Sequence, residues 1–178
     1  MAFSQKILPH YTYADYLLWE GNWELIDGFP IAMSPSPLPK HQRISMLLGS
    51  AFTVALKNCK KCSVYDPIDY KVADDIILRP DILIVCKEIN KSFLDFPPAL
   101  VVEILSPATA LRDRHTKFDM YEQQEIKYYL IADPEKNTVE VYQLINSKYS
   151  LAASAGDTYQ FLFDEDCSAL INFKEIWT

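Results

Sequence analysis

The sequence has no apolar run long enough to cross a membrane. A spanning helix needs about 20 consecutive apolar residues, and the mainly apolar runs of this 178-residue chain, such as ILIVC and ALVVEIL, are far shorter. The opening stretch, MAFSQKILPHYTYADY, holds no extended apolar segment after its single lysine, so we expect no signal peptide. From these absences we expect a cytoplasmic protein that has no membrane partner.

Cysteine is scarce, and its spacing excludes the common zinc patterns. The chain has four cysteines, of which Cys59 and Cys62 form one CxxC pair. A zinc site of the usual kind needs a second pair at a suitable spacing, and Cys86 and Cys167 do not form one. A redox-active CxxC is expected at the start of a helix, whereas this pair follows a predicted helix. We therefore expect free structural thiols and a reducing compartment.

Positive charge is also scarce. The chain has 17 Lys and Arg against 24 Asp and Glu, which gives a net charge of −7. This balance argues against a large non-specific surface for nucleic acid, although a small local one is still possible. The basic residues gather in three short groups, whose simplest interpretation is a solvated helix face: Lys40/Arg43, Lys57/Lys60/Lys61 and Arg112/Arg114/Lys117.

The remaining composition, 49% hydrophobic and 23% charged, is that of one globular domain covering residues 1–178, without repeats or low-complexity segments. Apolar periodicity and turn residues predict its elements. Helices are expected at 12–20, 40–57 and 109–124, and an Asp-Gly hairpin at 23–33 with a proline-rich loop at 34–39 after it. Strands are expected at 64–72, 76–86, 99–105, 127–132, 138–144, 149–153 and 159–163. This order predicts an α/β sandwich around a mixed sheet.

Two carboxylates lie where a buried strand would ordinarily hold none. Asp81 is in LRPDILIVC and Glu103 is in ALVVEILS, and buried charges are costly unless they are paired or bind metal. Carboxylate oxygens favour Mg²⁺ or Mn²⁺. Lys117 follows on the next predicted helix, within reach of the strand end. The alternative is that Asp81 closes a strand and that Glu103 only pairs with Arg112 or Lys117.

Five strings in the chain resemble the Uma2 family, which was formerly called DUF820 and is abundant in cyanobacteria. They are WELIDG, SPSPLPKHQ, RPDILIV, LVVEILSPAT and RDRHTKFDMYEQQEIKYYLIADPEKNTVEVY. The resemblance covers nearly the whole chain and extends to the order and spacing of the strings. It implies a restriction endonuclease-like fold of the PD-(D/E)xK nuclease superfamily, in which a central mixed β-sheet is flanked by helices.

The resemblance also implies roles for particular residues. Pro80-Asp81 matches the PD of the motif, and Glu103 matches its second acid. The commonest pattern has a lysine two positions after that acid, where this chain has Leu105, so Lys117 is the candidate lysine. Glu24 resembles an additional acid near the site, although it could instead be a solvent-facing strand residue.

We therefore expect a nuclease that depends on Mg²⁺ or Mn²⁺, with Asp81, Glu103 and the carbonyl of Ile104 as metal ligands. Lys117 would position or activate water, and Asp113 would orient Lys117. Nucleic acid, DNA before RNA, would be contacted by Arg112, Arg114 and Lys40.

A homodimer is expected, with the aromatic meander 142–163 as a candidate contact. His41 is more simply a hydrogen-bonded or exposed residue than a catalyst. The alternative function is an inactive nuclease-fold module that binds a partner or nucleic acid.

Overall fold

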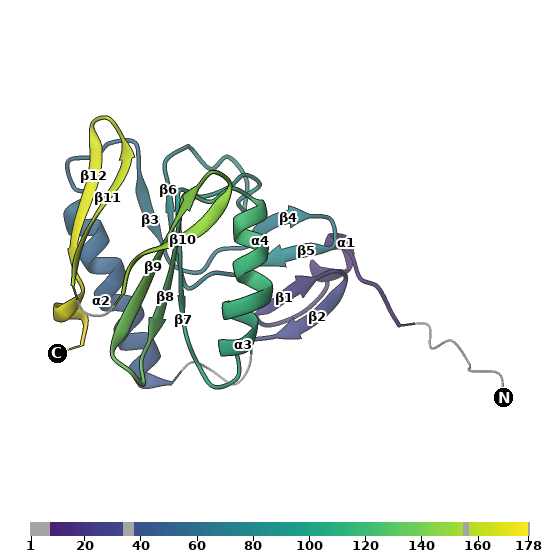
Figure 1. Ribbon diagram of the computed structural model, residues 1–178. Coiled ribbons are helices and arrows are strands. Elements are labelled where there is room, and N and C mark those ends of the chain that lie inside the picture. Colours follow the sequence, from purple (N-terminus) through teal and green to yellow (C-terminus); the bar gives the residue numbers. More distant parts are fainter. Residues whose placement is uncertain (1–7, 34–37, 155–156, 178) are drawn as a thin grey trace.

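The computed structural model describes residues 8–33, 38–154 and 157–177. A mixed six-stranded sheet lies in the middle of the molecule, in the order β10-β9-β8-β7-β6-β3. Figure 1 shows α2 and the β11–β12 hairpin on one side of this sheet, and α3, α4 and a smaller sheet on the other side. The prediction of an α/β sandwich with a central mixed sheet is confirmed.

The central strand β7 (Leu100–Ile104) is buried along its whole length, as its β-branched sequence predicts. It pairs antiparallel with β6 (Ile82–Val85) and parallel with β8 (Tyr128–Asp133). The sheet is completed on one side by β3 and on the other by a meander. The bounds of these strands are Ser63–Tyr65 for β3, Thr138–Ile145 for β9 and Lys148–Ala153 for β10.

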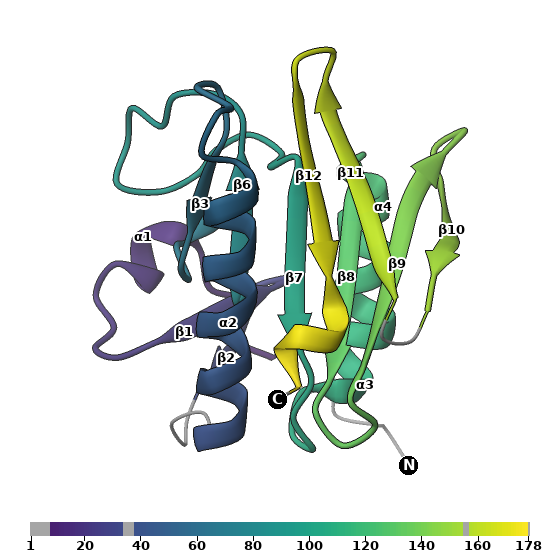
Figure 2. The ribbon, with the colours of Figure 1, turned by 90° about the vertical axis from the view of Figure 1, so that its left-hand side faces the viewer.

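One face of the large sheet is covered by α2 (Pro39–Ala55) and by the hairpin of β11 (Thr158–Asp164) and β12 (Cys167–Asn172). Figure 2 shows both lying against this face. The apolar stripe of α2 supplies Ile44, Leu48 and Phe52 to the core, as the helical spacing predicts. The chain continues into a short 3₁₀ helix, Phe173–Ile176, whose sequence carries no clear periodic pattern.

The smaller sheet has the order β2-β1-β5-β4. Its hairpin, β1 (Trp23–Ile26) and β2 (Phe29–Ala32), turns at Asp27 and Gly28, which both have positive φ, as the Asp-Gly signal predicts. Pro30 lies on the edge strand β2, where its missing N–H is tolerated. The helix expected at 12–20 is shorter in the structure, where α1 spans only Tyr13–Tyr16. Beyond its end, Trp19 packs against Tyr11 and Trp23.

Two predicted strands are each divided between the two sheets. The segment 64–72 forms β3 in the large sheet and β4 (Tyr70–Ala73) in the small one, and 76–86 forms β5 (Ile76–Leu78) in the small sheet and β6 in the large one. Each division falls at a proline, Pro67 or Pro80, which cannot donate to a strand ladder. The chain thus crosses between the sheets immediately before Asp81.

The predicted helix 109–124 is a composite. It begins as α3 (Ala110–Arg112), continues as a π-helical turn at Asp113–Lys117 and ends as α4 (Phe118–Gln123). Thr109 is at the N-cap position, but its side chain makes no capping hydrogen bond there. A π-turn is rare and is often found at functional sites, and here it contains Lys117.

The expectation of free thiols is wrong for this structure. Cys59 is bonded to Cys167, and Cys62 is bonded to Cys86, so all four cysteines of the chain are paired. The reason is tertiary, because the folding of the large sheet and the β11–β12 hairpin brings together residues separated by 108 and 24 positions. The argument for a reducing compartment, which rested on free thiols, loses its support.

The aromatic side chains of the meander lie largely within the fold. Tyr142 and Tyr149 both pack against Phe118, with ring centroids 5.0 and 5.2 Å away. The homodimer stays a prediction.

Among the residues that the structure describes, no helix combines the length and the apolar character needed to cross a membrane. The proline-rich loop expected at 34–39 falls mostly outside the described residues.

Two glycines offer a test of the fold with opposite expected results. Gly28 has φ +73°, and an added Cβ would clash with the ring of His10, so we expect Gly28→Ala to lower the free energy of unfolding by about 1 kcal/mol or more. Gly49 lies inside α2 with open space around it, so Gly49→Ala should raise the same quantity by about 0.5–1 kcal/mol. Urea denaturation of both variants measures the two effects. A change of the same sign in the free energy of unfolding of both variants would contradict the turn geometry.

Candidate active site

A buried lysine holds together carboxylates from three parts of the fold. The Nζ atom of Lys117 lies 2.6 Å from Oε1 of Glu24, 2.9 Å from Oε1 of Glu103 and 3.7 Å from Oδ1 of Asp113. Glu24 comes from β1 in the small sheet, Glu103 from β7 in the large sheet, and Asp113 from the π-turn. All four side chains are almost completely buried.

Glu24 is not a solvent-facing strand residue. Its side chain has no exposed surface, and its Oε1 accepts a hydrogen bond from the backbone N–H of Arg79 at 3.0 Å. Its Oε2 lies 3.5 Å from Nε of Arg112 but makes no hydrogen bond among the described residues. The hairpin therefore directs Glu24 inward, toward the seam between the two sheets.

Glu103 has a second partner that the sequence interpretation did not include. The hydroxyl of Tyr121 donates to Oε1 of Glu103 at 2.7 Å, beside the 2.9 Å contact from Lys117. The four-residue spacing of Asp113, Lys117 and Tyr121 places them on one helix face, and that spacing was the signal available in the sequence.

Asp81 is the member of the site that reaches the surface. Because β6 and β7 are neighbours, Asp81 lies next to the end of the strand that carries Glu103, and its Oδ2 accepts from the backbone N–H of Ile104 at 2.8 Å. Nε2 of His41, at the start of α2, lies 3.3 Å from the same oxygen. Asp81 and His41 line one end of a cleft of about 620 Å³ between α2 and the β3 region.

The site has an excess of negative charge. Glu24, Asp81, Glu103 and Asp113 lie near Lys117 and Arg112, so full ionisation of the acids would give four negative charges against two permanent positive ones. A protonated His41, beside Asp81, would add a third positive charge. Burial raises the pKa of Glu103 well above its ordinary value, and the other acids add to this, although Lys117 opposes it. Burial likewise raises the pKa of Asp113. Proton uptake by Glu103 or Asp113, or the binding of a divalent cation, would each reduce this excess.

Burial acts in the opposite direction on the pKa values of the basic groups, but nearby acids reverse its effect. Burial lowers the pKa of Lys117, but the charges of Glu103, Glu24 and Asp113 more than offset this, and the net shift is strongly upward. Burial also lowers the pKa of His41. The hydrogen bond to Asp81 and the negative charge of Asp81 outweigh this effect, so the net shift of the His41 pKa is upward. Lys117 is therefore a permanent cation at neutral pH.

The donor set suits a hard divalent cation. The described hydrogen bonds and ion pairs of Asp81 all end on Oδ2, and those of Glu103 all end on Oε1. Oε2 of Glu24 and both carboxylate oxygens of Asp113 are buried without a hydrogen bond among the described residues. Mg²⁺ and Mn²⁺ prefer such oxygens and keep several waters. The Ile104 N–H binds Asp81, and the role of the Ile104 carbonyl stays a prediction.

The three basic residues expected to contact nucleic acid differ in their surroundings. Arg112 lies beside Glu24 with 22% of its side chain exposed. Arg114 instead forms a two-bond pair with Glu140, at 2.9 and 2.8 Å, and lies 3.7 Å from Asp133. Lys40 bonds to the carbonyl of Pro134 and to the side chain of Asn137. The structure thus brings only Arg112 into contact with the acidic cluster.

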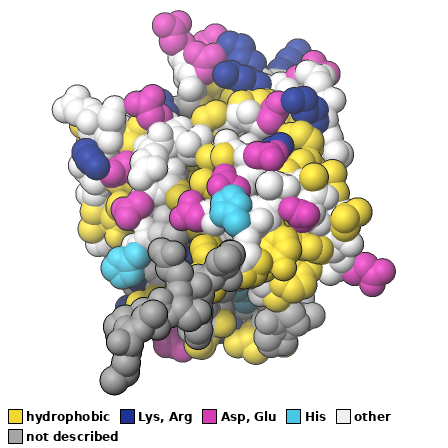
Figure 3. Space-filling view, turned by 90° about the vertical axis from the view of Figure 1, so that its right-hand side faces the viewer, with side chains coloured by type: hydrophobic (Ala, Val, Ile, Leu, Met, Phe, Trp, Pro, Cys, Tyr) yellow, Lys and Arg dark blue, Asp and Glu magenta, His cyan; other side chains and the backbone are white. Residues whose placement is uncertain are grey.

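The surface on the side of α1 and the small sheet carries no broad basic area. Figure 3 shows Lys and Arg gathered mainly toward one end of this face, with acidic side chains spread across its middle. This agrees with the net charge of −7. Any contact with a phosphate backbone on this face would therefore be local.

The comparisons with known proteins show the family and the fold of this chain. The model of the Uma2 family, described as "Putative restriction endonuclease", matches residues 13–162, and the chain belongs to this family. A crystal structure of a putative nuclease of DUF820 from Anabaena variabilis ATCC 29413 superposes with a TM-score of 0.75 at 18% identity. The alignment covers 93% of this chain and 97% of that one, which shows a shared fold. A search among curated proteins found no significant match.

Removing the buried cation should be costly. Lys117→Met leaves Glu24 and Glu103 buried without their partner, and breaking a buried ion pair in this way typically costs about 3–5 kcal/mol. Lys136→Met is a matched control, because Lys136 is exposed and lies 3.1 Å from Asp133, and its loss should cost less than about 1 kcal/mol. Urea denaturation compares the two variants. Equal losses would show that the cluster does not depend on Lys117.

The pair of Arg114 and Glu140 should produce a pH-dependent stability. The hydrogen bond from Arg114 holds the pKa of Glu140 below its ordinary value of 4.5. The stabilisation, about 1 kcal/mol, should then be fully present above pH 4.5 and be lost as the pH falls through the lowered pKa. Thermal unfolding should show Glu140→Gln less stable than the unmodified chain at pH 7, with the difference shrinking in acid. Glu135→Gln, at an exposed neighbouring position, should show no such difference.

Proposed function

We propose that this member of the Uma2 family is a metal-dependent phosphodiesterase that cuts nucleic acid, with DNA as the first candidate substrate. The observation that carries the proposal is the excess of carboxylates over basic groups around Lys117 and Glu103, next to Asp81, which lines a cleft. An ordinary structural ion-pair network would balance its charges. This one has more acids than bases, and a divalent cation at Asp81 and Glu103 would balance it.

Asp81 and Glu103 would hold Mg²⁺ or Mn²⁺, each through the oxygen that the described hydrogen bonds leave free. Such an ion would lower the pKa of a bound water and stabilise charge on a phosphate. The chain's own contribution is the fixed position of the two carboxylates. The amide of Ile104 orients Asp81, and the hydroxyl of Tyr121 orients Glu103. Asp81, with 15% of its side chain exposed, is the acid that meets the cleft.

Lys117 would act as a charge rather than as a base. Its raised pKa keeps the ammonium group protonated, so it cannot accept a proton from water at neutral pH. A fixed cation beside the reacting phosphate stabilises the charge that develops there, and it can orient a water by hydrogen bonding. Asp113 supports this role, because its carboxylate lies 3.7 Å from Nζ and helps to hold the lysine charged.

Arg112 is the strongest candidate for a phosphate contact. It is partly exposed, and its partner Glu24 is already satisfied on one side by Lys117 and the Arg79 amide. Arg114 would have to release Glu140 before it could bind a phosphate, and Lys40 would have to release Pro134 and Asn137. The proposal therefore ranks Arg112 before Arg114 and Lys40.

Asp81→Asn is the sharpest test. The Asn side chain keeps the shape of Asp81 and an oxygen that can accept from the Ile104 amide, so the fold should be retained. With Mn²⁺ or Mg²⁺ we expect purified protein to nick plasmid DNA, and the nicking rate should fall on the order of 100-fold or more in this variant. Asp119→Asn, at an exposed position on α4, should nick at the unmodified rate.

The same nicking assay can also contradict the proposal. Nicking that survives both Asp81→Asn and Glu103→Gln would come from a contaminant or another site, and the proposal would be wrong. Lys117→Ala is a poor probe, because the loss of a buried cation also threatens the fold. Circular dichroism of each variant separates loss of activity from loss of structure.

The alternative is an inactive nuclease-fold module, and one observation favours it. Lys117 is 2% exposed and sealed among acids, so the cluster already has a cation that belongs to the chain itself. In that case the site would serve stability only. Calorimetry with Mn²⁺ separates the two functions, because a catalytic site must bind the metal and an inactive one need not. No heat of binding at millimolar Mn²⁺ would favour the inactive module.

A further inference from the structure

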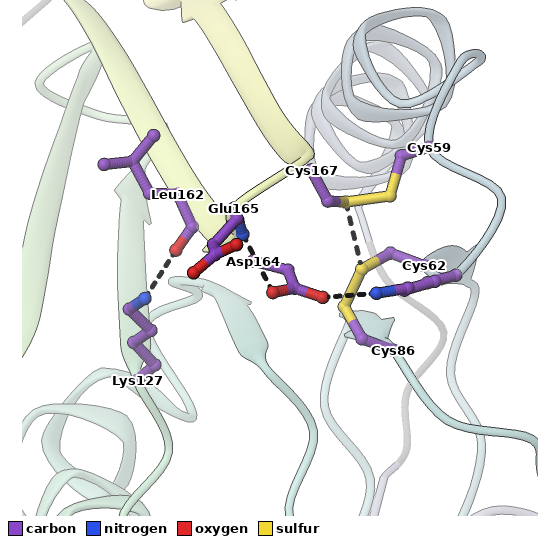
Figure 4. The surroundings of a disulfide bond; sticks show 9 residues. Cys59, Cys62, Cys86, Lys127, Leu162, Asp164, Glu165 and Cys167 are labelled. Carbon is purple, nitrogen blue, oxygen red and sulfur yellow. Dashed lines mark hydrogen bonds and ion pairs between the residues drawn. A yellow bond between two sulfur atoms is a disulfide. The ribbon is translucent and has the colours of Figure 1, made fainter.

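All four cysteines of the chain meet at one place, at some distance from the acidic site. Cys59 follows α2, Cys62 precedes β3, Cys86 follows β6, and Cys167 is the first residue of β12. Figure 4 shows the two disulfides side by side, with Sγ of Cys167 lying 3.3 Å from Sγ of Cys62. The sulfurs therefore form a continuous chain in the order 59, 167, 62, 86.

We propose that these four cysteines, when reduced, form a binding site for one Zn²⁺ ion. In a tetrahedral site with Zn–S bonds of about 2.3 Å, the sulfurs are about 3.8 Å from one another. The sulfurs of Cys59, Cys62 and Cys167 already lie within 4.8 Å of one another. Cys86 is bonded to Cys62, so its sulfur is adjacent to the same point. Reduction would free the paired sulfurs to separate toward this spacing.

The local sequence suits zinc as well as the geometry does. Cys59 and Cys62 have the C-x₂-C spacing found in structural zinc sites, and the fold supplies the second pair that the linear sequence lacks. Four thiolates around one Zn²⁺ leave two negative charges. Lys60 and Lys61 lie between the first two ligands. Lys61 is paired with Asp164 at 2.6 Å, and Lys60 can offset part of the thiolate charge.

The burial of the ligands points to a closed, structural site. Cys62 and Cys167 are 7% and 3% exposed, and Cys59 and Cys86 are half-buried. Structural zinc sites are four-coordinate and leave no open position, unlike catalytic ones. Cys86 and Asp81 lie just beyond opposite ends of β6, five residues or roughly 16 Å apart along an extended strand. The cysteine site is therefore separate from the acidic site.

The disulfide-bonded form and the zinc-bound form are related by a balanced reaction. Two molecules of a dithiol reductant each transfer two electrons and two protons, which breaks both disulfides and leaves four thiols, while each reductant closes its own disulfide. Zn²⁺ then binds as the thiols release four protons, because the thiolate is the ligand. An oxidant that removes four electrons from the thiolates reverses the exchange, restores the disulfides and releases the metal.

The test uses the untagged full-length chain, treated with a dithiol reductant, freed of excess reagent without exposure to air, and mixed with Zn²⁺ or Co²⁺ alone. We expect one Zn²⁺ per chain by elemental analysis. We also expect four thiols that become reactive only after the zinc is removed. With Co²⁺ we expect the visible and charge-transfer absorption of tetrahedral thiolate coordination.

Single substitutions identify the ligands. Cys59→Ser and Cys167→Ser should each abolish the tetrathiolate spectrum, whereas Ser168→Ala, at an exposed position beside Cys167, should leave it intact. Two variants are used because Cys167 is in the core and its loss could disturb folding. Four free thiols that bind no Zn²⁺ would overturn the proposal, as would disulfides that resist the reductant in the folded chain. An iron–sulfur chromophore in the purified protein would overturn it too.

Discussion

The burial of one lysine among acids is the interaction on which the rest of the architecture depends. Lys117 can be buried only because Glu24 and Glu103 both reach it, and those two acids can be buried only because Lys117 is there. Their backbones belong to different sheets. Pairing the buried charge of Lys117 with both acids therefore requires that the small sheet, the large sheet and the composite helix meet at one point.

The π-turn has a physical role in this meeting. It widens the helix over Asp113–Lys117, and within it both residues are buried and face the acids. The turn is held from the sheet side as well, because the hydroxyl of Tyr129 donates to the carbonyl of Asp113 at 2.8 Å. Such a turn costs helix hydrogen-bond geometry, and the ion pairs of Lys117 offset that cost.

Much of the site could be predicted because its residues break a local rule. A carboxylate within an apolar strand, as at Glu103, requires a partner, and the sequence places Lys117 on the next helix. The other features arise from tertiary structure. The contact of His41 with Asp81 joins α2 to the start of β6, and the meeting of Cys62 with Cys167 joins residues 105 positions apart. Likewise, the strands expected at 64–72 and 76–86 each divide between two sheets at Pro67 or Pro80, and the sequence does not reveal that the two parts join different sheets.

Glu24 differs from the other members of the site in the sheet that carries it. Asp81, Glu103 and Lys117 belong to the large sheet or to the helix packed on it, whereas Glu24 belongs to the small sheet. Buried side chains of both sheets, including Ile26 and Leu78 of the small one and Leu83 and Val101 of the large one, pack in one core. Lys117 therefore gains the second of its two closest acids only when the two sheets are packed together. The ion pair between Lys117 and Glu24 is thus a direct indicator that the seam between the sheets is closed.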